Sequence, residues 1–257
     1  MLTAITRDVS ASLAQCQLSF VDRAPIDVAR AHAQHEAYRD ALAALGCEVI
    51  ALPAQDAMPD AVFVEDTAIV LDEVAILTRP GAPSRRGEGE TVAAALAGYR
   101  TVRAIEAPGT IDGGDVLRVG REIFVGRSAR TNEDGIAQLA AIAQPFGYRV
   151  TAVPTRDCLH LKSAVTAVSH DTLLIQPRWI DREPFADFKL IEVDPEEEHA
   201  ANALRIGDAG IVYPSSFPRT RERIEQAGVR VVPVDLSELQ KAEGATTCCS
   251  IVFRRSA

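Results

Sequence analysis

Apolar and polar residues alternate in four pairs of short segments, and a brief turn joins the two members of each pair. The first pair, AVFVEDTAIVLDEVAILTRP, turns at Leu71, Asp72 and Glu73. The other three are DVLRVGREIFVGRS, SAVTAVSHDTLLIQP and ANALRIGDAGIVYP, which turn at 120–122, 170–171 and 207–208. Alternation with a period of two on both sides of a short turn predicts β-hairpins.

Segments with helical spacing follow three of these hairpins. Residues 87–99, 132–147 and 219–229 place their apolar side chains on one face of a helix. Asn132, with acidic residues directly after it, predicts a helix N-cap, and Gly147 predicts the end of that helix. The segment that follows the third hairpin, 180–188, is short and contains a proline, so a helix there is doubtful.

A short apolar segment closes each of these units. Five such strands are predicted at about 48–53, 101–107, 148–154, 189–194 and 229–235, with a helix over 27–45 before the first. Their regular spacing indicates a repeat architecture. The N-terminal LTAITR and the C-terminal CSIVFRR supply a fifth hairpin. The sequence therefore predicts one catalytic domain over 1–257, an α/β propeller of five pseudo-symmetric ββαβ units around a central channel.

Unusual polar residues follow every closing strand, in PDAVFVED, GTIDGGD, CLHLK, DPEEEHAAN and GATTCCS. In a pseudo-symmetric ring these segments occupy equivalent places around one channel. We therefore expect the channel to gather Asp60, Glu65, Asp66, Asp112, His160 and Cys248.

This group of side chains contains the parts of a nucleophilic site. A cysteine reacts as its thiolate, and a histidine oriented by a carboxylate can act as general acid and base. Cys248, His160 and Asp112 supply these three groups. Each also has an ordinary structural interpretation: a buried core thiol, a histidine in a strand between two leucines, and a turn aspartate like Asp115. Their recurrence at one position of each repeat favours a site.

Charged residues around this group indicate the substrate. Clustered carboxylates bind a guanidinium, whose planar N–H groups pair with them. Arg85 and Arg130 each follow the second strand of a hairpin, where they are either solvated loop residues or a clamp for a carboxylate. Together these groups predict an amino-acid substrate whose side chain ends in a cation.

Composition narrows the setting. The five cysteines are irregularly spaced without a CxxC pair, which favours a reducing cytoplasm and argues against a structural zinc site. Zinc could inhibit by binding the Cys248 thiolate, but no metal or other cofactor is expected. A net charge of −9, no basic apolar leader and no apolar run of membrane-spanning length argue against nucleic-acid and membrane partners. A homodimer is left open.

Six segments carry a resemblance to a known family. PDAVFVED, LTRPGAPSRR, DGGDVL, FVGRSARTN, LHLKS and TTCCS resemble, in order and over nearly the whole chain, the dimethylarginine dimethylaminohydrolases (dimethylargininases) of the guanidine-modifying pentein superfamily. The resemblance implies the five-bladed propeller and hydrolysis of asymmetric dimethylarginine or monomethylarginine to citrulline and an amine, through a covalent cysteine thiouronium.

The resemblance also implies a role for individual residues. Cys248, and not Cys249, matches the nucleophile, His160 the acid and base, and Asp112 its carboxylate partner. Glu243 stands where relatives carry aspartate, and the segment from Leu18 to Pro25 is a candidate flap. The positions that match substrate contacts are Leu18, Asp60, Phe63, Glu65, Asp66, Arg85, Arg130 and Ala242, the last through its backbone carbonyl.

Three alternatives are compatible with these residues. A sister hydrolase, such as an arginine deiminase or a citrulline hydrolase, would use the same core motifs. A propeller that only binds its ligand would not need Cys248, His160 and Asp112 together. A redox or metal sensor would depend on Cys248 and Cys249. The complete nucleophilic set favours an enzyme.

Overall fold

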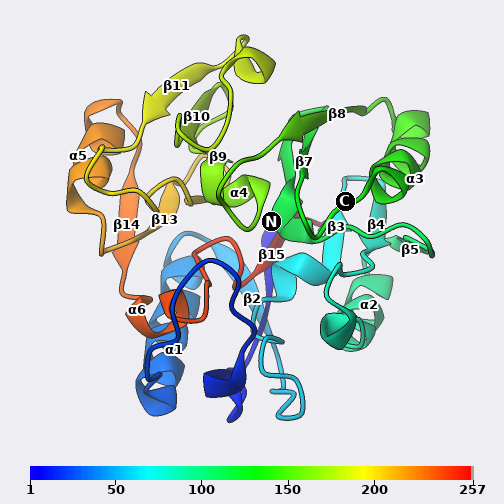
Figure 1. The fold of residues 1–257 in the computed structure, drawn as a ribbon, viewed down its shortest axis with the longest axis horizontal. Helices are drawn as coiled ribbons and strands as arrows, with labels where there is room; N and C mark the ends of the chain where they lie inside the picture. The colour runs from blue at the N-terminus through cyan, green and yellow to red at the C-terminus, as the bar shows by residue number, and fades with distance from the viewer. Residues whose placement is uncertain (256–257) are drawn as a thin grey trace.

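The computed structural model describes residues 1–255, which form five small sheets of three strands arranged as a ring (Figure 1). In each sheet the first two strands are antiparallel and the third is parallel to the second. This is the predicted five-bladed α/β propeller. The blades, in ring order, are β15 (Ile251–Arg254), β1 (Leu2–Arg7) and β2 (Cys47–Leu52); β3 (Ala68–Val70), β4 (Val74–Leu77) and β5 (Thr101–Ala104); β6 (Val116–Val119), β7 (Glu122–Arg127) and β8 (Arg149–Pro154); β9 (Val165–Ala167), β10 (Thr172–Ile175) and β11 (Lys189–Glu192); and β12 (Leu204–Arg205), β13 (Ile211–Pro214) and β14 (Val231–Val234).

The ends of the described chain close the ring. β1 pairs with β15 in antiparallel register from Leu2 opposite Arg254 to Ile5 opposite Ile251. The two strands lie side by side near the centre of the molecule (Figure 1). The fifth hairpin predicted from the two ends of the sequence is therefore confirmed.

Four helices connect the second strand of a blade to its third strand and lie at the outside of the ring (Figure 1): α1 (Val28–Ala44), α2 (Glu90–Ala97), α3 (Glu133–Ala143) and α5 (Pro218–Gln226). The Asn132 side chain caps α3 by accepting a hydrogen bond from the N–H of Gly135 at 2.9 Å. The fourth blade has the single 3-10 turn η6 (Glu183–Phe185) in this place, as its short proline-containing segment suggested. Two short helices lie between blades along the chain: α4 (Leu161–Ala164) directly precedes β9, and α6 (Ser237–Gln240) follows β14.

The hydrophobic core is divided into five clusters, one between each pair of neighbouring blades. Successive side chains of a strand point to opposite faces of its sheet. In β10, Leu173 and Ile175 accordingly pack toward the third blade while Leu174 packs toward the fifth. Strands buried on both faces explain apolar runs such as TLLI, and the packing holds the blades in a ring.

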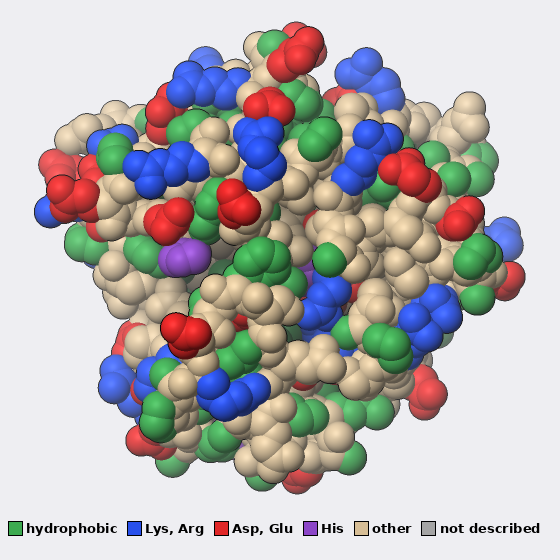
Figure 2. Space-filling view, in the orientation of Figure 1, with side chains coloured by type: hydrophobic (Ala, Val, Ile, Leu, Met, Phe, Trp, Pro, Cys, Tyr) green, Lys and Arg blue, Asp and Glu red, His purple; other side chains and the backbone are tan. Residues whose placement is uncertain are grey.

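The surface in Figure 2 mixes charges of both signs. Acidic and basic side chains are interspersed over the visible face, with apolar side chains scattered among them. This face carries no single basic patch of the kind that binds nucleic acid. Within residues 1–255, no helix is long and apolar enough to cross a membrane.

Candidate active site

The predicted site residues lie where the chain enters the first strand of a blade. Asp66 lies on the 3-10 turn η2 (Val64–Thr67) before β3, Asp112 just before β6, His160 before β9 and Cys248 before β15. The propeller thus brings together groups that are distant in sequence. A small cavity is lined by eight of the predicted site residues: Asp60, Phe63, Asp66, Arg85, Arg130, His160, Ala242 and Cys248. Gln17, Leu159 and Glu243 complete its lining.

This cavity is small. Its volume is about 20 Å³, enough for about one water molecule. Cys248 is half-buried and His160 is buried. A substrate of amino-acid size needs more space than this cavity offers, and the burial of the surrounding groups strengthens the interactions between their charges.

His160 is held by Asp112 from one side. Its Nε2 lies 3.1 Å from Asp112 Oδ2, and Asp112 Oδ1 accepts a hydrogen bond from the N–H of Gly81 at 2.8 Å. Asp66 Oδ1 lies 3.9 Å from Nδ1 on the other side of the ring. Burial lowers the pKa of the imidazole, but the Asp66 charge and the Asp112 hydrogen bond outweigh it and raise the pKa to about 9. His160 therefore carries a proton at neutral pH.

The backbone around His160 differs from the sequence-based expectation. Alternation with its leucine neighbours predicted a strand, but His160 is the N-cap residue of the short helix α4. Asp115, which looked like a turn residue, fixes this helix by accepting the N–H of Leu161 at 2.9 Å. Asp115 is fully buried and also accepts from the Thr131 hydroxyl at 2.7 Å. Alternation over three residues cannot distinguish a strand from a capped turn.

The two glycines of DGGD allow the close packing of this centre. A Cβ on Gly113 would collide with the carbonyl group of Glu65. A Cβ on Gly114 would lie 2.5 Å from His160 Nδ1 and 2.8 Å from Asp66 Oδ1. The N–H of Gly114 donates to that same Asp66 oxygen at 2.9 Å. Glycine is thus required where the backbone passes the two catalytic side chains.

Asp66 and Arg85 form a buried ion pair. Arg85 Nη1 lies 2.7 Å from Asp66 Oδ2, and Arg85 Nη2 lies 2.8 Å from Glu88. Burial alone would raise the pKa of Asp66, but His160 and Arg85 hold it at about 2. The Arg85 guanidinium reaches the cavity while two carboxylates already engage it. Its role in binding a substrate carboxylate stays a prediction, since the guanidinium lines the cavity and is also paired with Asp66 and Glu88.

Arg130 is the more available arginine. It is half-buried, and its Nη2 donates to the Ser19 hydroxyl at 3.2 Å. Asp60 lies in the same cavity and accepts the N–H of Gln17 at 3.2 Å. Burial raises the pKa of Asp60, with Arg85 opposing the rise. The cavity thus presents a cation and a carboxylate that match the two charges of an α-amino acid.

Glu65 lies behind the cavity wall. Its carboxylate accepts from Lys162 Nζ at 2.5 Å and from the Thr247 hydroxyl at 2.7 Å. Burial raises the pKa of Glu65, although Lys162 counteracts this. Glu65 and Lys162 therefore lie next to the catalytic cavity and line the larger pocket behind it, and a substrate contact of Glu65 stays a prediction.

Cys248 and Cys249 have different surroundings. Burial, and then the charges of Glu65 and Asp66, raise the pKa of the Cys248 thiol well above its usual range. Cys249 is fully buried in the core cluster between the first and fifth blades, and its Sγ contacts the carbonyl of Ala245 at 3.5 Å. Cys248 lines the cavity, which agrees with the expectation that it, and not Cys249, is the reactive thiol.

A loop crosses the opening of the cavity and is fastened by Glu243. One oxygen of Glu243 accepts the backbone N–H groups of Ser19 at 2.8 Å, Phe20 at 2.5 Å and Val21 at 3.0 Å. Glu243 has a φ of 59°, a left-handed conformation that is uncommon for this residue type. Leu18 packs on the core, and its neighbour Gln17 lines the cavity. The sequence marked Glu243 as unusual without showing this contact.

A cluster of three potential metal ligands is present at the site. Ligand atoms of Asp66, Asp112 and His160 lie within 4.8 Å of one another. Arg85 and the N–H groups of Gly114 and Gly81 already engage these carboxylates. Much of the hydrogen-bonding capacity of these carboxylates is therefore already taken up by Arg85 and by backbone N–H groups.

A propeller of five ββαβ blades with a cysteine, a histidine and carboxylates in its channel defines a guanidine-modifying hydrolase of the pentein class. Residues 7–254 match the family model described as "N,N dimethylarginine dimethylhydrolase, eukaryotic". The chain belongs to this family of dimethylarginine dimethylaminohydrolases.

Curated relatives and solved structures agree with this membership. The chain is 40% identical over 255 residues to the N(G),N(G)-dimethylarginine dimethylaminohydrolase of Streptomyces coelicolor, covering 98% of this chain and 96% of the relative. It is 39% identical over 229 residues to the Pseudomonas aeruginosa enzyme of the same name, covering 88% and 90% of the two chains. A structure of the Pseudomonas enzyme, a cysteine-to-serine variant complexed with citrulline, superimposes with a TM-score of 0.94 at 38% identity, covering 98% and 100%.

Proposed function

We propose that this protein hydrolyses Nω-methylated arginines, asymmetric dimethylarginine and monomethylarginine, to citrulline and dimethylamine or methylamine. The observation that carries the proposal is that Cys248, His160 and Asp66 line one cavity, with His160 hydrogen-bonded to Asp112 behind it. The family membership supports it, as does the citrulline complex of the Pseudomonas relative.

In the first half of the reaction the Cys248 sulfur attacks the central carbon of the substrate guanidinium. The raised pKa of Cys248 keeps the thiol protonated in the free protein. A bound cation favours the thiolate, so the thiol releases its proton to solvent when the substrate binds. A carbon–sulfur bond forms as the bond to the methylated nitrogen breaks. His160, protonated at neutral pH, donates its proton to the departing amine. The product on the enzyme is a cysteine thiouronium.

In the second half a water molecule replaces the sulfur. His160, now neutral, removes a proton from the water as its oxygen bonds to the same carbon. The carbon–sulfur bond then breaks, which releases citrulline and regenerates Cys248. Asp112 accepts a hydrogen bond from the ring and stabilises its charged form, so His160 can alternate between acid and base.

The remaining groups position the substrate in this proposal. Asp66 binds the guanidinium, and Glu65 supplies a second negative charge from below. Asp60 binds the α-amino group, and Arg130 binds the α-carboxylate, with Arg85 adding positive charge nearby. In this proposal Leu18 and Phe63 contact the substrate with their apolar side chains, and Ala242 contacts it with its backbone carbonyl.

We further propose that the loop from Leu18 to Pro25 opens to admit the substrate. Two observations support this proposal: the cavity of about 20 Å³ is too small for an amino acid, and Glu243 holds the loop through three backbone N–H groups. Closure excludes water during the first half of the reaction. Cys249 serves as a packing residue in the core.

The test is incubation of the purified protein with asymmetric dimethylarginine, monomethylarginine, arginine and citrulline in separate reactions, followed by mass spectrometry of citrulline, ammonia and amine. We expect citrulline from the methylated arginines and little from arginine. Preferred turnover of arginine, or consumption of citrulline, would assign a sister hydrolase instead. Catalysis by a Cys248→Ser variant would contradict the role of the thiol.

A further inference from the structure

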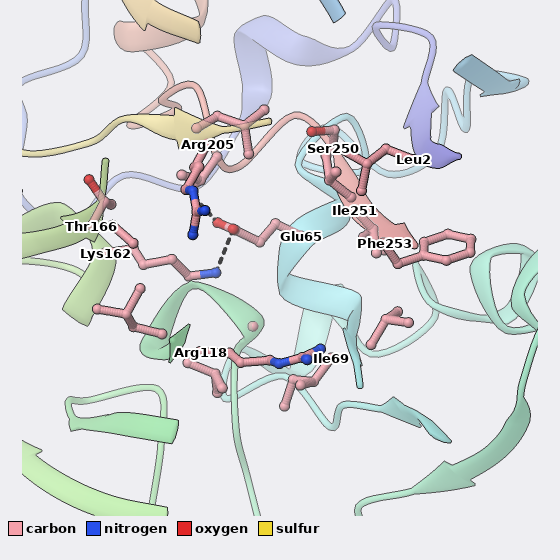
Figure 3. Close-up of a pocket in the computed structure, with 18 of the residues that line it drawn as sticks. Leu2, Glu65, Ile69, Arg118, Lys162, Thr166, Arg205, Ser250, Ile251 and Phe253 are labelled. Carbon is pink, nitrogen blue, oxygen red and sulfur yellow. Dashed lines mark hydrogen bonds and ion pairs between the residues drawn. The ribbon is translucent and has the colours of Figure 1, made fainter. Parts of the chain in front are cut away.

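A second cavity, of about 400 Å³, lies further along the channel than the active site. The catalytic groups precede the first strand of each blade, whereas this cavity is lined by the first strands themselves and by the hairpin turns that follow them. Glu65, Lys162 and Thr247 line its inner end. Figure 3 shows the Glu65–Lys162 ion pair at this end of the cavity. Asp66, next to Glu65 in the chain, lines the catalytic cavity, so the ion pair lies between the two cavities. We call the larger one the rear pocket.

The rear pocket carries more positive than negative charge. Four cationic side chains line it and only two carboxylates, although the whole chain has a net charge of −9. Both carboxylates are paired inside the pocket, Glu65 with Lys162 at 2.5 Å and Asp72 with Arg118 at 2.6 Å. A concentration of cations in an otherwise acidic protein favours an anionic ligand. The cations are Arg118, Lys162, Arg205 and Arg254.

Two of these arginines occupy corresponding positions in different blades. The strand pairing places Arg118 opposite Ile123 and Arg205 opposite Ile211 at the matching point of their hairpins. In each case Nε donates to the carbonyl of the glycine two residues later, at 3.0 and 2.9 Å. This shared bond anchors the stem of each side chain. Ala167 holds the corresponding position in the blade between them and leaves space.

Three cations of the rear pocket, Arg118, Lys162 and Arg205, lie around the space beside Ala167. In Figure 3, Lys162 lies between Arg205 and Arg118, and its amino group is directed into the pocket toward Glu65. Arg118 pairs with Asp72, which is 49% exposed, and Arg205 pairs with Asp208, which is 97% exposed. An anionic ligand can replace these exposed carboxylates. Surface ion pairs of this kind contribute little stability. A buried oxyanion bound by the same groups would contribute more.

We propose that the rear pocket binds a small organic polyanion through carboxylate or phosphate oxygens on Arg118, Arg205 and Lys162. A volume of about 400 Å³ is that of a small-molecule site. Apolar side chains on the neighbouring strands, Leu117 and Val252 among them, contact the body of such a ligand. Two anionic groups on one ligand would reach the two arginines from the shared space above Ala167. Arg118 and Arg205 have no part in the proposed reaction, and Glu65 with Lys162 forms the boundary between the two cavities.

The test is isothermal titration calorimetry of the full chain with citrate and with pyrophosphate, at constant ionic strength set with chloride. We expect saturable binding of one ligand per chain by at least one of the two anions. Citrate alone would assign carboxylates and pyrophosphate alone would assign phosphates. Binding is read without turnover, so the result is independent of the catalytic proposal.

Three variants locate the binding. Arg118→Gln and Arg205→Gln should each weaken it about tenfold or more, because each removes charge-assisted hydrogen bonds. Arg121→Gln is the matched control, since Arg121 also pairs with a carboxylate, Glu73, and stacks on Tyr148 as Arg118 does, but it lies outside the pocket. Its affinity should stay within about twofold of the unmodified chain.

Three outcomes would overturn the proposal. Neither anion binds saturably, or Arg121→Gln weakens binding as much as Arg118→Gln, which would indicate nonspecific attraction to surface charge. The third is loss of binding in Arg130→Gln with retention in Arg118→Gln and Arg205→Gln, which would place the anion in the catalytic cavity. Circular dichroism and melting temperature of each variant establish that it is folded.

Discussion

Replacing Asp112 by asparagine should lower the pKa of His160 and remove its ability to protonate the leaving amine. Oδ1 of the asparagine can still accept the N–H of Gly81, as Asp112 does at 2.8 Å. Its amide NH₂ then faces His160 Nε2, where the carboxylate stood at 3.1 Å. A donor in that place favours the neutral ring with its proton on Nδ1.

The size of the effect follows from the charge that is removed. A unit charge about 4 Å away, at an effective dielectric constant of about 20, is worth about 4 kcal/mol, or about 3 pKa units, as an upper limit. Burial continues to lower the pKa, while Asp66 continues to raise it. We therefore expect the pKa of His160 to fall from about 9 by about one to three units.

The assay is NMR titration of the histidine ring carbons between pH 5 and 10, with His160 identified from a His160→Asn spectrum. kcat for dimethylarginine should fall by about 10²-fold to 10⁴-fold, as is typical when a catalytic histidine loses its carboxylate or its proton. Asp181→Asn is a control, because Asp181 is exposed and pairs with Arg156 at the surface. A His160 pKa that stays near 9 in Asp112→Asn would refute this reasoning.

Three other predictions concern the loop, the glycine turn and a buried histidine. Glu243→Gln removes the charge that accepts three loop N–H groups, so it should raise KM about tenfold and speed limited proteolysis between residues 18 and 25, with substrate restoring protection; unchanged cleavage with substrate would contradict a mobile loop. Gly114→Ala should reduce kcat by at least about 10²-fold in a folded protein, because its Cβ displaces His160 and Asp66; near-normal turnover would contradict the packing argument. Neither ring nitrogen of His35 has a hydrogen-bond partner within residues 1–255, and burial lowers its pKa to about 4. As the pH falls, the unfolded chain therefore binds a proton at this histidine before the folded chain does. The free energy of unfolding is unaffected above about pH 6.5 and falls by up to about 3 kcal/mol as the pH drops toward 4. Urea unfolding of His35→Leu should show a weaker pH dependence than the unmodified chain, and an identical dependence would contradict this role of His35.

The repeat could be predicted from the sequence because each blade contains its own local signals. The hairpin turns, the cap at Asn132 and the closing strands each occupy a few neighbouring residues. The continuous apolar segment TLLI became a strand buried on both faces, between two core clusters. Pseudo-symmetry then placed Asp66, Asp112, His160 and Cys248 around one channel, and the structure places them there.

Directions of side chains and long-range partners could not be predicted in the same way. Asp66 and Glu65 are adjacent, yet one lines the catalytic cavity and the other pairs with Lys162 behind it. Arg85 follows its strand as Arg130 does, but Glu88, three residues later, engages its guanidinium. Such differences arise from packing between distant segments, for which alternation and spacing carry no signal.

The contact between Glu243 and the loop is another example. The accepting Glu243 and the donating N–H groups of the loop are separated by more than 220 positions in the chain. A glutamate in a left-handed turn could be noticed in the structure and not in the sequence. Asp115 was similarly visible only as a turn residue, although it holds the helix that carries His160 in place.

The central claim is that Cys248 forms a covalent intermediate with a methylated arginine. Its most direct test is rapid acid quenching during turnover of asymmetric dimethylarginine, followed by intact-mass and peptide mass spectrometry. We predict an added mass equal to the substrate less dimethylamine, located on Cys248 and not on Cys249, and its loss in Cys248→Ser. An adduct on Cys249, or citrulline formation by the Cys248→Ser variant, would contradict the account.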